Sequence, residues 1–278
     1  MERGKRRMRA RNYQRKARRA LKGKWVRTAA LLLLAGAVLG VLALIISIAA
    51  MGPLMVSVFK GLDRMVYGAE AATSELVQIP AAFFVIVTVG SLIACVVQSL
   101  LVVGMSKVGR AVLRGENPGP RLLFPLELLG KAVAMNLVRA ALVGVQLMLL
   151  IAPGVVAMYR YSMADYLLAA HPELGPIEAL RKSAKRMKGR KVALFQLQIR
   201  FIGWAALCVL PGFLISLWTN FSLLGAVRMT LGSYALSIAA TLLGAGGGLF
   251  VGAYALTAIT AFFRGADKPA KKRKVQAK

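Results

Sequence analysis

Long runs of apolar residues alternate with short basic stretches along this chain. The clearest run, Ala29–Ala50, contains twenty-two residues without a charge. At about 1.5 Å per helical residue, such a run matches the roughly 30 Å hydrocarbon core of a bilayer. The long runs are Ala29–Ala50, Ile79–Met105, Ala132–Ala152, Leu194–Leu217 and Leu231–Phe263, and a shorter, more polar run is Val155–Ala170. This pattern predicts an all-α, polytopic integral membrane protein built from transmembrane helices.

The basic residues between the runs predict which side of the membrane each loop faces. Residues 1–27 carry thirteen Lys and Arg, residues 107–131 five, residues 181–191 seven and residues 264–278 seven. Loops close to membrane spans hold their excess of Lys and Arg on the cytoplasmic side. By this positive-inside rule both termini and the two basic internal loops are expected in the cytoplasm.

The two basic internal loops flank Ala132–Ala170, so the chain must enter the membrane and return within that segment. As one helix its 39 residues would reach about 58 Å, too long for a single crossing. Pro153 removes a backbone donor and Gly154 permits a reversal, so we predict a helical hairpin that turns there. This prediction gives six transmembrane helices. The alternative is one kinked helix, which gives five.

Three regions follow from this pattern: a basic cytoplasmic N-terminal segment at 1–27, a helical transmembrane domain at 28–263, and a basic cytoplasmic tail at 264–278. Both the N-terminal segment and Gly175–Lys191 combine helically spaced apolar residues with many cations. Basic amphipathic helices of this kind bind anionic membrane surfaces. The expected lipid-surface residues are Arg181, Lys182, Lys185, Arg186, Lys188, Arg190 and Lys191.

Composition narrows the function classes. The chain is 58% hydrophobic with a formal net charge of +28, a combination that soluble domains rarely show. Lys271–Val275 looks like a nuclear localisation signal, but it follows a membrane span and lacks aromatic interleaving. We therefore expect a bilayer with anionic headgroups as partner and no nucleic acid.

Candidate chemistry is sparse. The chain has one histidine, and Cys95 and Cys208 lie in separate apolar runs, where two free thiols are expected rather than a disulfide. A metal site of the His or Cys kind cannot be assembled from these residues. The sequence contains no nucleophile motif, phosphate-binding glycine loop or carboxylate pair. We expect no cofactor and no enzymatic activity.

Ionisable residues within the apolar runs mark the candidate site. They are Arg139, Arg160, Asp165 and Arg200. Charges inside a membrane are costly and default to a functional role. The first interpretation is snorkelling and structural pairing, in which Asp165 forms an ion pair with Arg200 or Arg139, because Arg160 lies five residues away and off helical register. The second is a shared polar cavity that faces the cytoplasm.

Gly244, Gly248 and Gly252 recur every fourth residue in the last apolar run. Small residues at this spacing let a second helix approach closely in lipid. The partner helix belongs either to the same chain or to the second copy in a homodimer.

A series of short motifs resembles a known family. Ser, Met-Lys-Gly, Leu-Phe and Phe-Ile-Gly-Trp occur in order at Ser183, Met187–Gly189, Leu194-Phe195 and Phe201–Trp204, and matching features stand at Ala17, Leu21, Gly23, Trp25, Pro153-Gly154 and Tyr159–Ala164. These residues resemble domain of unknown function 975, a family of bacterial integral membrane proteins. Arg200 departs from the pattern, which has a serine there. The resemblance implies a multi-pass protein of the bacterial plasma membrane, but the family is uncharacterised and implies no activity.

Two functions therefore stay open. The first is a non-catalytic membrane component that engages anionic lipids or other membrane proteins. The alternative is a permease or exporter of a small solute, with Arg139, Arg160, Asp165 and Arg200 along its path.

Overall fold

The computed structural model describes residues 2–67, 79–223 and 231–267. Within these residues the chain is almost entirely helical and contains no strand, which confirms the all-α prediction. The helices are α1 (Glu2–Leu21), α2 (Trp25–Tyr67), α3 (Ala81–Arg114), α4 (Leu129–Leu149), α5 (Ile151–Tyr161), α6 (Ala164–Ala170), α7 (Pro176–Arg186), α8 (Lys191–Leu223) and α9 (Leu231–Asp267), with 3-10 turns η1 (Pro120–Leu123) and η2 (Leu126–Leu128).

Five helical segments of the described chain are long and apolar enough to cross a membrane. They are Trp25–Leu62, Ala81–Arg114, Pro120–Leu149, Lys191–Ile215 and Ile238–Asp267. Each of the five predicted long apolar runs lies wholly or mostly within one of these segments. The 43 residues of α2 reach about 65 Å, so this helix extends well beyond a roughly 30 Å hydrocarbon core. The chain is a multi-pass membrane protein.

The predicted hairpin is present, but its turn is not where the sequence placed it. Leu150 alone has extended backbone angles and separates α4 from α5. Pro153 instead lies in the first turn of α5, where a missing backbone donor costs nothing. Gly154 is buried against α4, because a Cβ there would meet the side chain of Leu147. Its small size serves the contact between the limbs rather than the reversal.

The six-span prediction is not confirmed. The returning limb is divided at Ser162-Met163 into α5 and α6, of 11 and 7 residues, and neither reaches the length of a membrane span. The limb nevertheless brings the chain back to its starting point. Lys131 Nζ, at the start of α4, donates a hydrogen bond to the carbonyl oxygen of Pro172 after α6 at 2.6 Å.

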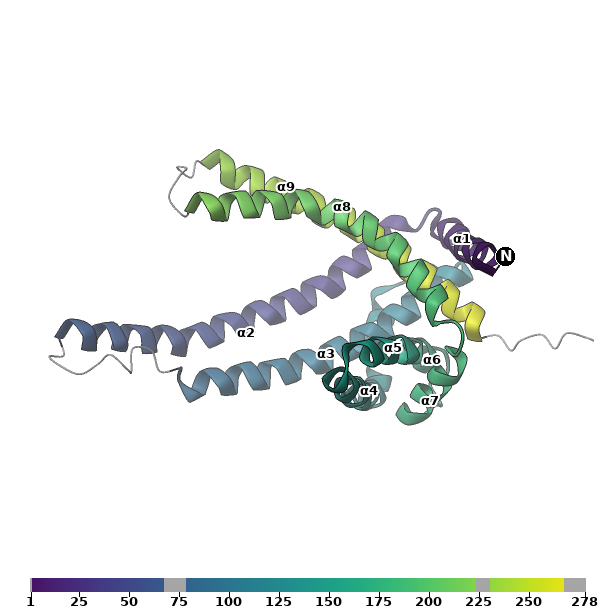
Figure 1. Ribbon diagram of the computed structural model, residues 1–278, viewed down its shortest axis with the longest axis horizontal. Coiled ribbons are helices and arrows are strands. Elements are labelled where there is room, and N and C mark those ends of the chain that lie inside the picture. Colours follow the sequence, from purple (N-terminus) through teal and green to yellow (C-terminus); the bar gives the residue numbers. More distant parts are fainter. Residues whose placement is uncertain (1, 68–78, 224–230, 268–278) are drawn as a thin grey trace, which may run out of the picture.

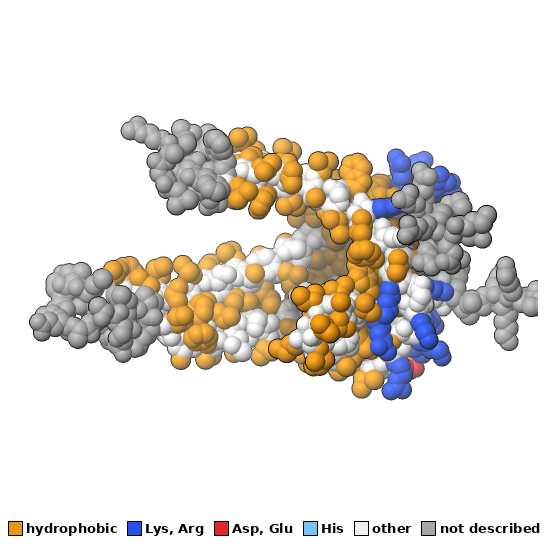
Figure 2. Space-filling view, in the orientation of Figure 1, with side chains coloured by type: hydrophobic (Ala, Val, Ile, Leu, Met, Phe, Trp, Pro, Cys, Tyr) orange, Lys and Arg blue, Asp and Glu red, His pale blue; other side chains and the backbone are white. Residues whose placement is uncertain are grey.

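The four longest helices form two hairpins that diverge from one end of the molecule (Figure 1). α2 pairs with α3, and α8 pairs with α9. We call their diverging parts the arms: residues 36–62, 81–96, 202–217 and 235–250. The closed end comprises α1, residues 22–35, residues 97–201 with the 3-10 turns and α4–α7, and residues 251–267. Figure 2 shows Lys and Arg gathered at the closed end and hydrophobic side chains along the arms.

The core lies in the closed end. Leu21, Met163, Leu167, Met187 and Leu194 are all fully buried there. In the arms, only Ala50 and Gly90 are buried among the residues whose burial is described. The arms therefore present their apolar side chains outward, as helices in lipid do.

Both ends of the described chain meet at the closed end. The Tyr13 ring of α1 packs edge-on against Phe262 of α9, with ring centroids 5.5 Å apart. Ala17 and Leu21 of α1 are fully buried. The predicted 264–278 tail lies outside the described residues beyond Asp267. Cys95 and Cys208 are free thiols, as predicted.

Candidate functional site

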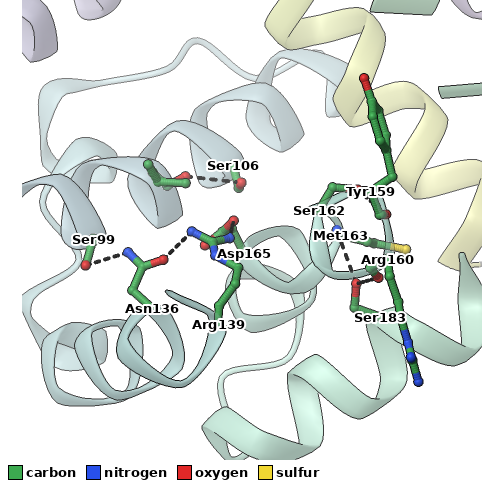
Figure 3. A network of polar contacts seen from close by, with 11 residues as sticks. Ser99, Ser106, Asn136, Arg139, Tyr159, Arg160, Ser162, Met163, Asp165 and Ser183 are labelled. Carbon is green, nitrogen blue, oxygen red and sulfur yellow. Dashed lines mark hydrogen bonds and ion pairs between the residues drawn. The ribbon is translucent and has the colours of Figure 1, made fainter. Parts of the chain in front are cut away.

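A chain of polar side chains crosses the closed end from α3 to α6 (Figure 3). Asn136 Nδ2 on α4 donates to Ser99 Oγ on α3 at 2.5 Å, and Asn136 Oδ1 accepts a hydrogen bond from Arg139 Nη2. Arg139 Nη1 then pairs with Asp165 Oδ2 at 2.5 Å. Asn136 and Arg139 are three residues apart on one helix face, which brings their side chains together.

Asp165 is the buried carboxylate of this network. The residue is 7% exposed and lies in the first turn of α6, and its Oδ1 atom has no hydrogen-bond partner among the described residues. The Arg139 side chain is 24% exposed. A buried carboxylate is stable as an ion only when it is paired, and Arg139 supplies the opposite charge.

The structure separates the four ionisable residues singled out in the sequence. Arg139 pairs with Asp165, whereas Arg200 donates a hydrogen bond to Gln14 Oε1 of α1 at 3.3 Å. Arg160, at the end of α5, points away from the Asp165 carboxylate (Figure 3). Its guanidinium lies 5.6 Å from the centroid of the Tyr161 ring. The four residues do not line one cavity.

Sequence reasoning missed the polar residues that hold this region together. Ser183 of α7 is fully buried, accepts a hydrogen bond from the Met163 backbone N–H at 3.2 Å and donates to the Arg160 carbonyl oxygen at 3.0 Å. The Ser183 hydroxyl therefore satisfies backbone groups at the interruption between α5 and α6, where these groups lack helical hydrogen-bond partners. The only signal for Ser183 was its place in the family-like motif. Asn136 could have been found from its position one helical turn before Arg139.

A second feature of the closed end is a cavity of about 450 Å³ between α4, α5 and α7. Four cationic side chains line it, and its other lining side chains are apolar or aromatic. The cations are Arg160, Arg181, Lys185 and Lys188, and the remaining residues are Val138, Leu142, Tyr161, Ile177, Leu180 and Ala184. We call it the basic pocket.

The cations of the basic pocket have no carboxylate partner among the described residues, whereas neighbouring cations on α7 do. Lys182 pairs with Glu178 at 2.9 Å, and Arg186 pairs with Asp267 at the end of α9. The Lys182 ammonium donates a hydrogen bond to Glu178 and lowers the pKa of that carboxyl. Four unpaired positive charges around one cavity produce a strongly positive local potential, which attracts an anion.

The seven residues predicted to face lipid thus divide by position. Arg181, Lys185 and Lys188 line the basic pocket, and Lys182 and Arg186 form ion pairs within the chain. Arg190 and Lys191 lie where the chain passes from α7 into α8.

Two of the three predicted seam glycines of α9, Gly244 and Gly252, face helices of the same chain. A Cβ on Gly244 would meet the carbonyl oxygen of Cys208 on α8, and one on Gly252 would lie 3.6 Å from Leu32 Cδ1 on α2. A Cβ on Gly248 would meet nothing within 4 Å. Gly247, which was not part of the predicted seam, faces the Cys208 sulfur, where a Cβ would lie 2.9 Å away.

The comparisons identify a family. Residues 74–266 match the family described as protein of unknown function (DUF975), which covers more than half of the chain. No curated protein and no solved structure matches the chain. The chain therefore belongs to the DUF975 family, as its motifs indicated.

Proposed function

We propose that this DUF975 protein is a non-catalytic membrane component that engages anionic lipids of the bacterial plasma membrane through the basic pocket. One observation carries the proposal. Arg160, Arg181, Lys185 and Lys188 surround a cavity that apolar side chains also line, and none of the four forms a salt bridge with an acidic side chain of the described chain. Basic pockets between membrane helices on the cytoplasmic side suit anionic headgroups.

The two parts of the pocket correspond to the two parts of a phospholipid. The cations suit the phosphate, and the floor of Val138, Leu142 and Leu180 suits the first part of an acyl chain. Each Lys or Arg near an anionic surface contributes about 1 kcal/mol. Four cations that converge on one headgroup therefore supply enough energy to select an anionic lipid over a zwitterionic one.

The orientation is part of the same proposal. The basic pocket, α1 and the end of α9 all lie at the closed end, so the positive-inside rule places this end in the cytoplasm. Single cysteines at Lys182 and Phe59, exposed at opposite ends of the molecule, test it on a Cys95- and Cys208-free background. An impermeant thiol reagent added to intact cells should label Phe59→Cys and leave Lys182→Cys unlabelled. The reverse pattern contradicts the orientation.

The lipid proposal is tested on the full-length protein in detergent. Native mass spectrometry should show that it retains phosphatidylglycerol in preference to phosphatidylcholine. The triple variant Arg181→Gln, Lys185→Gln, Lys188→Gln removes about 3 kcal/mol of attraction, which corresponds to about a 100-fold loss of affinity. We expect this variant to lose its retained phosphatidylglycerol.

A matched control removes the same charge elsewhere. Arg18, Arg19 and Lys22 are exposed cations of the N-terminal segment that do not line the pocket. Their triple Gln variant should keep phosphatidylglycerol. Equal loss in both variants shows that overall charge holds the lipid, and retention in both shows that the pocket does not.

The permease alternative requires a polar route past Asp165. The cavity beside Asp165 is lined mainly by apolar side chains, and Arg160 and Arg200 lie outside it. These placements favour the lipid-engaging function over the transport of a small polar solute.

A further inference from the structure

A second cavity, of about 410 Å³, lies where α2, α3, α6 and α9 meet. The arms diverge from this point (Figure 1), and Figure 2 shows the space between them as a recess. Most of its lining is apolar, with Leu39 of α2 and Phe263 of α9 among the contributing side chains. We call it the arm cavity, and it shares no lining residue with the basic pocket.

The polar residues of the arm cavity are few and are mainly hydrogen-bond acceptors. They are Gln98, Ser106, Ser162 and Asp165. Ser106 Oγ donates to the Val102 carbonyl oxygen at 3.2 Å and Ser162 Oγ to that of Tyr159 at 2.9 Å, so each hydroxyl keeps only its lone pairs free.

The Asp165 carboxylate is the unexplained group in this lining. Its Oδ2 atom is bound by Arg139, whereas Oδ1 is buried and has no hydrogen-bond partner among the described residues. A buried acceptor atom without a hydrogen bond is unfavourable in apolar surroundings. A molecule that brings a donor to this atom would satisfy it.

The charges of Asp165 and Arg139 restrict which head group the bound molecule can carry. Arg139 balances the charge of Asp165, so the cavity does not require a cation. An anionic head would place its oxygens against lone pairs and is disfavoured. The apolar walls, which open towards the membrane-exposed arms, suit an alkyl chain.

We propose that the arm cavity binds an amphiphile from the bilayer whose head donates a hydrogen bond, a long-chain alcohol or amine, to Asp165 Oδ1. Its alkyl chain lies between α2 and α9. This site is independent of the basic pocket and takes the opposite kind of head, a donor rather than an anion.

The test uses the full-length protein in detergent with one cysteine in the arm cavity. Gly36 lines the cavity and has open space around it, so Gly36→Cys is tolerated on a Cys95- and Cys208-free background. The measurement is the rate at which N-ethylmaleimide modifies this thiol, with and without dodecylamine, dodecanol or dodecanoate. A probe at about twice its dissociation constant leaves about one third of the sites free, so labelling should slow about threefold.

We expect dodecylamine and dodecanol to protect the thiol and dodecanoate not to protect it. Protection by only one of the two donors also supports the site and identifies its head group. Val41→Cys, exposed on another face of α2, is the matched control and should label at the same rate throughout. Equal protection by dodecanoate, or no protection by any probe, overturns the proposal.

A second variant connects the effect to the carboxylate. Replacing Asp165 and Arg139 together by leucine removes the acceptor without leaving an orphan charge. In the Gly36→Cys background this pair variant should label as before but gain no protection from dodecylamine or dodecanol. Protection that persists in the variant overturns the role of Asp165. Retention of phosphatidylglycerol by the variant shows that it is folded and that the basic pocket is unaffected.

Discussion

The closed end and the arms use the same residue types in opposite ways. At the closed end Leu167 and Leu197 are fully buried, whereas in the arms Leu44 is 58% exposed and Leu243 is 78% exposed. In water such exposure would be unfavourable, but in lipid there is no hydrophobic penalty for it. The closed end is thus held together as a soluble domain is, and the arms depend on the bilayer and on close contacts between paired helices.

This comparison predicts that stability in detergent is concentrated at the closed end. Substitutions of buried residues there should change the melting temperature strongly, and substitutions of exposed residues on the arms should change it little. Four sets of variants test and sharpen this comparison, in order of decreasing expected effect; one sets the closed end against an arm, and three separate buried from exposed positions within the closed end.

The largest effect is expected at the Arg139–Asp165 pair. Asp165→Asn leaves the Arg139 guanidinium without its carboxylate, and breaking a buried ion pair typically costs about 3–5 kcal/mol. The melting temperature in detergent should therefore fall. Adding Arg139→Gln removes the orphan charge and should restore part of the loss.

Arg200 supplies the control for this pair, because it bonds to Gln14 rather than to Asp165. Arg200→Gln on the Asp165→Asn background should restore nothing. If Arg200→Gln restored the melting temperature and Arg139→Gln did not, Arg200 rather than Arg139 would be the ion-pair partner of Asp165.

The next effect compares one leucine from each region. Leu167 is fully buried in the closed end, so Leu167→Ala should destabilise the protein by about 2–5 kcal/mol through lost contacts and a cavity. Leu243 is mostly exposed on α9, and Leu243→Ala should leave the melting temperature almost unchanged. Equal shifts for both variants would mean that the arms bury Leu243 against a partner.

Much of this architecture could be predicted from the sequence. The apolar runs were right because a bilayer imposes one simple requirement, a length of about 20 apolar residues. The chain does return between the two basic loops, where Lys131 meets Pro172, but the six transmembrane helices that the hairpin prediction implied are not confirmed. The turn was placed three residues late, at Pro153 rather than Leu150, because proline fits a first helical turn as well as a break.

The candidate site was harder to predict because it depends on packing between distant segments. Arg139 and Arg200 lay at similar depth in the sequence pattern, and only the approach of α4 to α6 selects Arg139. The basic pocket joins Arg160 to three cations of 181–188 through the fold of α5 against α7. No periodicity along one helix carries that information.

A smaller effect distinguishes glycines by what surrounds them. A Cβ on Gly104 of α3 would meet the backbone of Leu123 in η1, with the Leu123 Cα 2.8 Å away, so Gly104→Ala should destabilise the protein by about 1–3 kcal/mol. Gly144 of α4 has open space, and Gly144→Ala should stabilise it by about 0.5–1 kcal/mol. Opposite shifts of the melting temperature support the packing at the closed end, and two shifts of the same sign contradict it.

The smallest effect belongs to the exposed Glu178–Lys182 pair on α7, which should mark the closed end as the water-facing region. Because Lys182 lowers the pKa of Glu178 in the folded protein, the pair stabilises the fold above the ordinary carboxyl value of 4.5. Its contribution is lost as the pH falls through the lowered pKa. Glu178→Gln should therefore lower the melting temperature slightly at neutral pH and low salt, and the difference from the parent should vanish in acid.

Salt and the partner residue provide the controls for this last prediction. The pair is solvent-exposed, so raising the ionic strength should shrink the effect at neutral pH as well. Lys182→Gln should reproduce the effect, and the double variant should add nothing further, because both single changes remove the same interaction. A difference that persists at low pH or at high salt would show that Glu178 contributes through contacts other than its charge, and that this face of α7 is packed against a partner rather than open to water.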